Sequence, residues 1–147
     1  MFALAKFAVA LVSAPGSASS AVAAPVGAPG FSDQIVWGPY NPHNGWTTWY
    51  NPSAGFGACG WFNGDYEWVA AIGNSLFQEM MIDGNPNHCQ ACGKTATVTY
   101  GDKSITVMIV DRCYACGYDD IDLSPSAFQQ FADLGVGKLF GVSWVFN

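Results

Sequence analysis

The sequence predicts a mainly β domain whose strands close into a barrel, with one or two short helices. Its 147 residues include 17 glycines and 8 prolines, a composition that favours many turns over a helical bundle. Half of the residues are hydrophobic and only 11% are charged, so a packed core can form. Predicted strands outnumber predicted helices along the chain, and that balance favours a closed barrel.

The first 24 residues predict a secretory signal peptide. Lys6 precedes an apolar run that is too short to span a bilayer, and the small residues at 21–24 match a signal-peptidase site. The alternative is a short helix of the core. No later segment is long and apolar enough for a membrane span, so we expect a secreted, extracellular protein whose mature chain begins near Pro25.

Residues 25–43 predict an extended arm ahead of the domain, which occupies residues 44–147. The arm is rich in Pro, Gly and Asn and has no sustained periodicity. Its aromatic residues Trp37 and Tyr40 can hold it against the domain.

The strand pattern is clearest in a hairpin in the middle of the domain. Residues 95–100 alternate polar and apolar side chains, and residues 104–110 continue as a mostly apolar strand. Gly101 and Asp102 supply the two-residue turn between them. The other predicted strands are residues 45–51, 67–72 and 139–146.

Two short helices are predicted. One begins near residue 74, with Asn74 or Ser75 as its N-cap. The other has Ser124 as its N-cap and Pro125 in its first turn, and Gly135 can end it. The apolar stripe of this second helix consists of Ala127, Phe128 and Phe131.

Charge narrows the choice of partner. Removal of the signal peptide leaves four basic residues against eleven acidic ones, and no basic patch remains to neutralise phosphates. We therefore expect no nucleic-acid partner and no membrane partner. The negative charge also disfavours strongly anionic polymers, so a neutral glycan fits better.

The cysteines allow two interpretations. The segments Cys89-x-x-Cys92 and Cys113-x-x-Cys116 have the spacing of zinc-ribbon ligands, whereas a secreted protein favours disulfides. Two disulfides and one remaining thiol are the simplest arrangement for five cysteines, and the sequence alone does not fix the pairing. The fifth cysteine is Cys59.

Several motifs follow one another in a fixed order. They are Gly-Trp-Thr-Thr-Trp-Tyr-Asn at 45–51, Gly-Ala-Cys-Gly at 57–60, Val-Asp-Arg-Cys at 110–113, Asp-Leu-Ser-Pro-Ser-Ala-Phe at 122–128 and Gly-Val-Ser-Trp at 141–144. Together they resemble the double-psi β-barrel domain shared by expansins, barwin-like proteins and bacterial rare lipoprotein A, and in particular the fungal single-domain expansin relatives called loosenins. The resemblance covers residues 44–147.

The resemblance implies a six-stranded double-psi barrel with an open groove that holds a glycan chain. It places Thr48, Asp111 and Asp122 at the polar centre of that groove. Each aspartate also has a structural alternative. Asp122 can bind the backbone ahead of the Ser124 cap, and Asp111 can lock a buried turn together with Arg112.

The chain departs from the family pattern at three points. Cys113 stands where bacterial expansins have a tyrosine, and the ring of Tyr114 is a candidate replacement. Cys89 is one cysteine more than the family needs, so the resemblance makes it the odd thiol and leaves Cys59, Cys92, Cys113 and Cys116 as the disulfide candidates. Full expansins carry a second, cellulose-binding domain after the barrel. Because the chain ends at Asn147, we expect weaker binding to crystalline cellulose.

The residues of the first strand argue against hydrolysis. Glycoside hydrolysis normally requires two carboxylates, and the endoglucanases on this barrel combine an acid matching Asp122 with a base early in the chain. Residues 47–51 contain no acid. We therefore expect a non-enzymatic protein, without cofactor or metal, that binds and loosens cell-wall polysaccharide (cellulose, β-glucan or chitin) as a monomer. The alternatives are a weak endoglucanase, a protease inhibitor or effector on the same barrel, and a metal-binding module that uses the two cysteine pairs.

Aromatic and acidic residues around the motifs complete the predicted site. Sugar rings stack on exposed aromatic faces, and we predict Trp49, Tyr114 and Tyr118 as the glycan-binding residues. Trp61, Phe62, Tyr66 and Tyr50 are further candidates, whereas Trp68 and Trp144 are predicted in the core. Asp119 and Asp120 are predicted to be solvated loop charges, and a calcium-binding or catalytic role is the alternative. Crowding of these carboxylates with Asp122 should raise some of the pKa values in the group.

Overall fold

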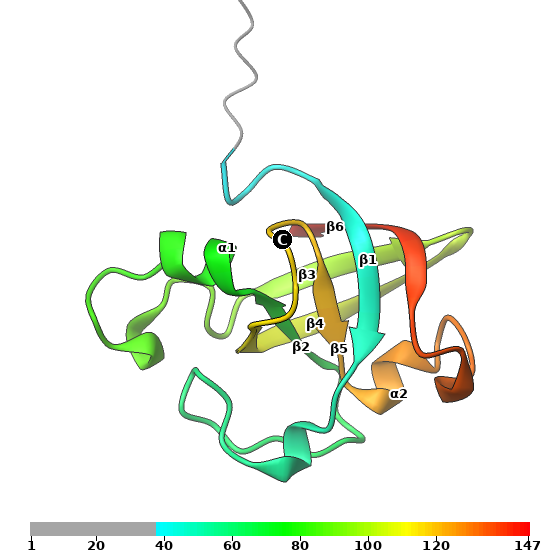
Figure 1. Ribbon diagram of the computed structural model, residues 1–147, viewed down its shortest axis with the longest axis horizontal. Coiled ribbons are helices and arrows are strands. Elements are labelled where there is room, and N and C mark those ends of the chain that lie inside the picture. The colour runs from blue at the N-terminus through cyan, green and yellow to red at the C-terminus, as the bar shows by residue number, and fades with distance from the viewer. Residues whose placement is uncertain (1–37) are drawn as a thin grey trace, which may run out of the picture. The chain divides into compact units, whose positions relative to one another are not determined.

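The structure, a computed structural model, describes residues 38–147, and their six strands form a closed barrel (Figure 1). The predicted signal peptide, most of the predicted arm and Trp37 lie outside the described residues. Around the barrel the strands follow the order β1-β5-β2-β4-β3-β6. This confirms the predicted fold class, a six-stranded, mainly β barrel with two short helices. The strands are β1 (His43–Trp49), β2 (Val69–Gly73), β3 (Thr95–Tyr100), β4 (Lys103–Cys113), β5 (Ile121–Leu123) and β6 (Leu139–Phe146).

The predicted hairpin is confirmed as β3 and β4. The two strands pair antiparallel from Thr95 opposite Met108 to Tyr100 opposite Lys103. Gly101 has a φ of 61°, the left-handed conformation that the tight turn requires at this position. β3 also pairs antiparallel with β6, so the hairpin closes one side of the barrel.

The opposite side of the barrel contains the two parallel pairings. β1 runs parallel to β5, and β2 runs parallel to β4. β5 lies between β1 and β2 and is only three residues long, so the sequence did not reveal it as a separate strand. This short strand nevertheless joins the two parallel pairs and places Asp122 in the middle of the sheet.

The core fills the barrel interior with alternating residues from every strand. Ile121 and Leu123 of β5 and Ala96 and Val98 of β3 have no exposed surface. Trp144 is 2% exposed, as predicted for a core residue. The prediction for Trp68 was wrong, because this side chain precedes β2 in a loop and is 44% exposed.

Both helices are shorter than or displaced from their predicted ranges. Helix α1 (Asn74–Glu79) has Gly73 at its N-cap, whereas the predicted cap was Asn74 or Ser75. Helix α2 (Pro125–Phe128) has Ser124 at its N-cap as predicted, but the Ser124 hydroxyl donates to the carbonyl of Glu67 and does not cap the helix. α2 ends long before Gly135, which lies in a separate 3-10 turn, Leu134–Val136.

Four of the five cysteines are bonded in pairs. Cys59 pairs with Cys92, and Cys113 pairs with Cys116. Cys89 is free and buried, in agreement with its expected role as the odd thiol. The pairing of Cys92 with Cys59 differs from the two Cys-x-x-Cys ligand pairs that a zinc ribbon would use.

The residues just before β1 lie against the barrel. Tyr40 packs edge-on against Phe146 at a ring-centroid distance of 5.9 Å, so the last residues before β1 contact the barrel. No helix within residues 38–147 is long and apolar enough to cross a membrane.

Candidate functional site

Four residues on four adjacent strands form one row across the barrel wall, which we call the polar row. Thr48 of β1 is in register with Asp122 of β5, Asp122 with Ala71 of β2, and Ala71 with Asp111 of β4. Side chains in register on neighbouring strands, about 4.8 Å apart, point to the same side of a sheet. The polar row therefore presents one hydroxyl and two carboxylates on the outside of the barrel, with a small side chain between the carboxylates.

The centre of the polar row is the contact between Thr48 and Asp122. The Thr48 hydroxyl donates a 2.6 Å hydrogen bond to Oδ1 of Asp122. Asp122 is half-buried, and its chain neighbours Ile121 and Leu123 point into the core. The short strand therefore holds the carboxylate on the outer face by directing both of its neighbours inward.

Burial raises the pKa of the Asp122 carboxyl above its ordinary value. The nearby charge of Asp111 also raises this pKa, while the hydrogen bonds from Thr48 and the Leu123 backbone oppose the shift. The expected source of such a shift, the neighbouring Asp119 and Asp120, is not its cause. The raised pKa extends the protonated form of this carboxyl to higher pH, and in that form it can donate as well as accept a hydrogen bond.

Asp111 has a structural role within the polar row. Its Oδ1 accepts hydrogen bonds from the backbone N–H of Ala58, at 2.7 Å, and of Arg112, at 2.8 Å. A side chain at Gly57 would collide with the carbonyl of Val110 and with Asp111, so the loop lies close against the end of β4. The turn lock predicted as an alternative is present, although it is made through backbone groups.

Tyr50 was a further candidate for stacking on sugar rings, but its contribution to this region is a buried hydroxyl group, which sequence reasoning did not predict. Within residues 38–147 this buried hydroxyl has no hydrogen-bond partner. Its pKa is raised by burial and by the charges of Asp111 and Asp122, so it stays protonated. The one signal for this position in the sequence was its place directly after the Trp-Thr-Thr-Trp motif.

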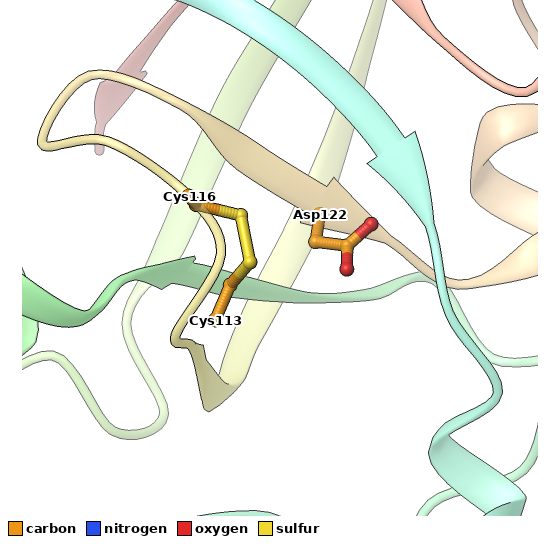
Figure 2. A group of neighbouring side chains, drawn as sticks. All are labelled: Cys113, Cys116 and Asp122. Atoms are coloured by element: carbon orange, nitrogen blue, oxygen red, sulfur yellow. A yellow bond between two sulfur atoms is a disulfide. The ribbon is translucent and has the colours of Figure 1, made fainter.

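A disulfide lies beside Asp122. The sulfur atoms of Cys113 and Cys116 and a carboxylate oxygen of Asp122 lie within 4.8 Å of one another (Figure 2). Cys113 is the last residue of β4, at the position where the resemblance predicts the tyrosine of bacterial expansins. Here the ring is replaced by a disulfide, and the nearest aromatic side chain in sequence, Tyr114, points to solvent with 73% of its surface exposed.

The two acidic residues before Asp122 hold the loop that precedes β5. Asp120 is 8% exposed, and its two oxygens accept from the backbone N–H groups of Trp46, at 3.0 Å, and Gly117, at 2.8 Å. Asp119 bonds Nδ1 of the buried His43 at 2.8 Å. The prediction of a solvated loop charge was wrong for Asp120, which is buried. Asp119 is exposed as predicted, and its bond to His43 also holds the β4–β5 connection against β1.

The three predicted aromatic residues have unlike surroundings. Tyr114 is exposed, and the Arg112 guanidinium lies 4.9 Å from its ring centroid. Trp49 is half-buried, and its indole N–H donates to the carbonyl of Leu134. The Tyr118 hydroxyl donates to Glu79 at 2.6 Å, and burial, followed by the contact with Glu79, raises the pKa of Tyr118 to about 12. Only Tyr114 offers a largely free ring face.

A second group of exposed aromatic side chains lies on the connection between β1 and β2. We call residues 52–68 the aromatic loop. Ala58 of this loop donates its N–H to Asp111, so this part of the loop lies beside the polar row. Two of its rings, Phe56 and Phe62, pack edge-on with centroids 6.0 Å apart. Its exposed rings are Phe56, Trp61, Phe62, Tyr66 and Trp68.

Taken together, the residues of this region suit recognition of a polar ligand. A carboxyl group with a raised pKa, a hydroxyl bonded to it and a buried phenol can each exchange hydrogen bonds with hydroxyl groups. The exposed rings of Tyr114, which directly follows β4, and of the aromatic loop offer apolar faces. Asp122 can also serve as a proton donor, because burial keeps its carboxyl protonated to higher pH.

Comparison with known proteins identifies relatives over most of the described region. The family model described as "Lytic transglycolase", a double-psi β-barrel, matches residues 43–140. The papain inhibitor of Streptomyces mobaraensis is 32% identical over 99 residues, which are 66% of this chain and 66% of the inhibitor. Allergen Asp f 7 of Aspergillus fumigatus is 43% identical over 56 residues, and the chain spans only 21% of the allergen's length.

Solved structures give the same fold. The Streptomyces papain inhibitor superposes with a TM-score of 0.66 at 31% identity, over 75% of this chain and 98% of the inhibitor. A variant of Clavibacter michiganensis expansin in complex with cellohexaose has a TM-score of 0.58 at 22% identity, over 73% of this chain and 50% of the expansin. At this identity the expansin shows a shared barrel.

Proposed function

Because the chain belongs to the double-psi β-barrel family, the expansin-like and barwin-like group whose model is described as lytic transglycolase, we propose that it binds a neutral cell-wall polysaccharide across the polar row. The bound chain is loosened from its neighbours without being cut. Cellulose, β-glucan and chitin are the candidate ligands. We further propose that the protein acts outside the cell, as a monomer, consistent with its two disulfides.

The observation that carries this proposal is the contact between Thr48 and Asp122 on the outer face of the barrel. In a polysaccharide network, hydrogen bonds between sugar hydroxyl groups hold neighbouring chains together, so a protein group that bonds a hydroxyl more strongly can replace the neighbouring chain. A half-buried carboxyl group, oriented at 2.6 Å by a fixed hydroxyl, offers a stronger partner than a neighbouring sugar. The expansin structure binds cellohexaose on the same fold, which supports an oligosaccharide ligand.

The disposition of the acids supports binding without hydrolysis. A hydrolase needs a free carboxylate to activate water across from the acid. Asp111 lies two strands from Asp122 in the polar row, but its Oδ1 is engaged by two backbone N–H groups. The residues of β1 beside Asp122 carry no acid. Loss of a positioned base removes about 10² to 10⁴ in rate.

The test pairs Asp122→Asn with Asp102→Asn, which removes the same charge from the exposed turn between β3 and β4. Pull-down on cellulose, β-glucan and chitin should show binding by the wild type and by Asp102→Asn. Asp122→Asn should bind about tenfold more weakly, because a hydrogen bond to a charged group is lost. Equal binding by all three proteins would refute the proposal.

The same samples distinguish binding from cleavage. An intramolecular transglycosylation, in which a substrate hydroxyl attacks, needs only one carboxyl group and creates no new reducing end. Soluble fragments must therefore be sought by mass spectrometry beside a reducing-sugar assay. We expect weakening of filter paper with no soluble fragments. Fragments that disappear in Asp122→Asn would make Asp122 a general acid of a lytic enzyme.

Inhibition of a papain-like cysteine protease is the second candidate function. The papain inhibitor is 31% identical and is covered over 98% of its length, and the aromatic loop exposes five large rings that a protein partner can bury. Assay of papain with the wild type, Asp122→Asn and Trp61→Ala separates the candidates. Inhibition that survives Asp122→Asn and is lost in Trp61→Ala would assign the function to the loop.

A further inference from the structure

We propose that reduction of the Cys113–Cys116 disulfide converts this pair, together with Asp122, into a three-ligand site for a thiophilic divalent cation such as Zn²⁺. The site differs from a zinc ribbon, because Cys89 and Cys92 take no part in it. Metal binding itself does not depend on the proposed polysaccharide function. The effect of the metal on ligand binding does rest on the proposed function, since a metal on Asp122 would occupy the centre of the polar row.

The three ligand atoms already lie close together. The two sulfurs and a carboxylate oxygen are all within 4.8 Å of one another (Figure 2). The two cysteines are three residues apart, the usual spacing of a zinc-binding pair, and their Cα atoms are 5.3 Å apart. Two thiolates and one carboxylate would bring three negative charges together, and a divalent cation offsets most of that repulsion. Three protein ligands also leave a fourth position for water or another donor.

The backbone holds these positions without help from the disulfide. Cys113 ends β4 in register with Gly73 of β2. Gly117, the residue after Cys116, donates its N–H to the buried Asp120, which also accepts from Trp46 of β1. Reduction therefore removes one bond from a loop that backbone hydrogen bonds still anchor at both ends.

Asp122 is positioned as a ligand by its neighbours. β5 lies between β1 and β2, so its backbone is bonded on both sides. The Thr48 hydroxyl fixes the carboxylate through Oδ1. Metal-binding carboxylates commonly carry such a hydrogen bond from a second residue, which orients them toward the ion.

The chemical step balances with a small thiol as reductant. Two equivalents of thiol reduce the disulfide through a mixed disulfide, giving the thiols of Cys113 and Cys116 and one equivalent of oxidised thiol. Binding of the divalent cation then displaces the two thiol protons to solvent. In the reverse reaction the oxidised thiol accepts two electrons and two protons and becomes two thiols, while the pair returns to the disulfide and releases the cation.

The test uses Cd²⁺, whose bonds to thiolates absorb in the ultraviolet. The protein is reduced with a dithiol, desalted under nitrogen and titrated with Cd²⁺. We expect one equivalent of Cd²⁺ with a thiolate band in the reduced protein and no band in the oxidised protein. Near-ultraviolet circular dichroism should show that the reduced protein stays folded, and loss of that signal would overturn the proposal.

Variants assign the ligands. The pair Cys59→Ala and Cys92→Ala should keep the band, because it removes only the other disulfide, and Cys89→Ser should keep it as well. The pair Cys113→Ser and Cys116→Ser should abolish it. Asp122→Asn should keep the band but weaken Cd²⁺ affinity at least tenfold. A band that survives in Cys113→Ser with Cys116→Ser, or an affinity unchanged by Asp122→Asn, would refute the site.

Discussion

The two Cys-x-x-Cys segments have the same spacing and opposite fates. In the connection between α1 and β3, Cys92 bonds to Cys59, 33 residues earlier, and Cys89 remains a buried thiol. After β4, Cys113 and Cys116 bond to each other across three residues, next to Asp122. One segment thus ties distant parts of the chain together, and the other modifies the candidate site.

Tertiary hydrogen bonds explain the difference. The N–H of Cys59 donates to the carbonyl of Val110, and the N–H of Gly93 donates to the carbonyl of Ile109. Both segments are therefore attached to adjacent residues of β4, which brings Cys59 and Cys92 together. Cys89 instead points its thiol at the carbonyl of Phe77 in the core. Spacing along the sequence is local information, whereas pairing depends on which strand each segment meets.

The largest expected effect is that of the long-range disulfide. Replacing Cys59 and Cys92 by alanine should lower the free energy of unfolding by about 4 kcal/mol, because the unfolded chain regains the freedom of a loop of 33 residues. Urea denaturation of the variant beside the wild type measures the loss. A loss no larger than that of the short disulfide would contradict the division of roles.

The short disulfide should matter less for stability. Replacing Cys113 and Cys116 by serine should cost about 2 kcal/mol by the same relation, since the closed loop is only three residues. The same denaturation experiment, carried out in parallel, compares the two variants directly. If this variant were the less stable of the two, the 114–120 loop would depend on its disulfide and not on Asp120.

Much of the fold could be predicted from local patterns, and the exceptions have identifiable causes. The β3–β4 hairpin was visible because six alternating residues meet a tight turn at Gly101. β5 was not visible as a strand, because three residues are too few to show a period of two. The second helix was predicted too long, because its apolar stripe continues into turns whose hydrogen bonds are mostly between residues three apart, such as that from the Phe131 N–H to the Phe128 carbonyl.

The buried thiol of Cys89 should show a smaller effect than either disulfide, and it tests the first Cys-x-x-Cys segment. Burial raises the pKa of Cys89, so the thiol should stay protonated and unreactive toward thiol reagents in the folded protein. Cys89→Ala should cost about 1 kcal/mol in the free energy of unfolding, the typical effect of a point substitution. Rapid labelling of Cys89 in the native protein would show that the α1–β3 connection opens readily.

The candidate site was less accessible to sequence reasoning than the fold. The resemblance predicted that Thr48 and Asp122 lie together, and the structure shows a hydrogen bond between them. The contacts of Asp111 with Ala58 and of Asp120 with Trp46 were missed, because each joins residues more than 50 positions apart. An acidic side chain that bonds backbone N–H groups looks the same in a sequence as one exposed to solvent.

The smallest expected effect is a change in the pH dependence of stability at Asp122. In the unfolded chain an aspartate ionises near pH 3.9, whereas burial raises the pKa of Asp122 in the folded protein. Below about pH 3.9 the carboxyl is protonated in both states and costs nothing. As the pH rises toward the folded pKa, only the unfolded state gains by ionising, so the stability of the wild type falls. Asp122→Asn cannot ionise and should lack this fall.

Denaturation of the wild type, Asp122→Asn and Asp102→Asn across that pH range measures the effect. The stability difference between Asp122→Asn and the wild type should grow in favour of the variant as the pH rises, then become constant above the folded pKa. Asp102→Asn, in an exposed turn, should follow the wild type. Reduction of the Cys113–Cys116 disulfide adds a further comparison. If reduction lets water reach Asp122, the stability of the wild type should fall less steeply as the pH rises. Parallel curves for all three proteins would mean that Asp122 is as well solvated as an exposed aspartate, and the polar row would lose the property that distinguishes it from the rest of the barrel wall.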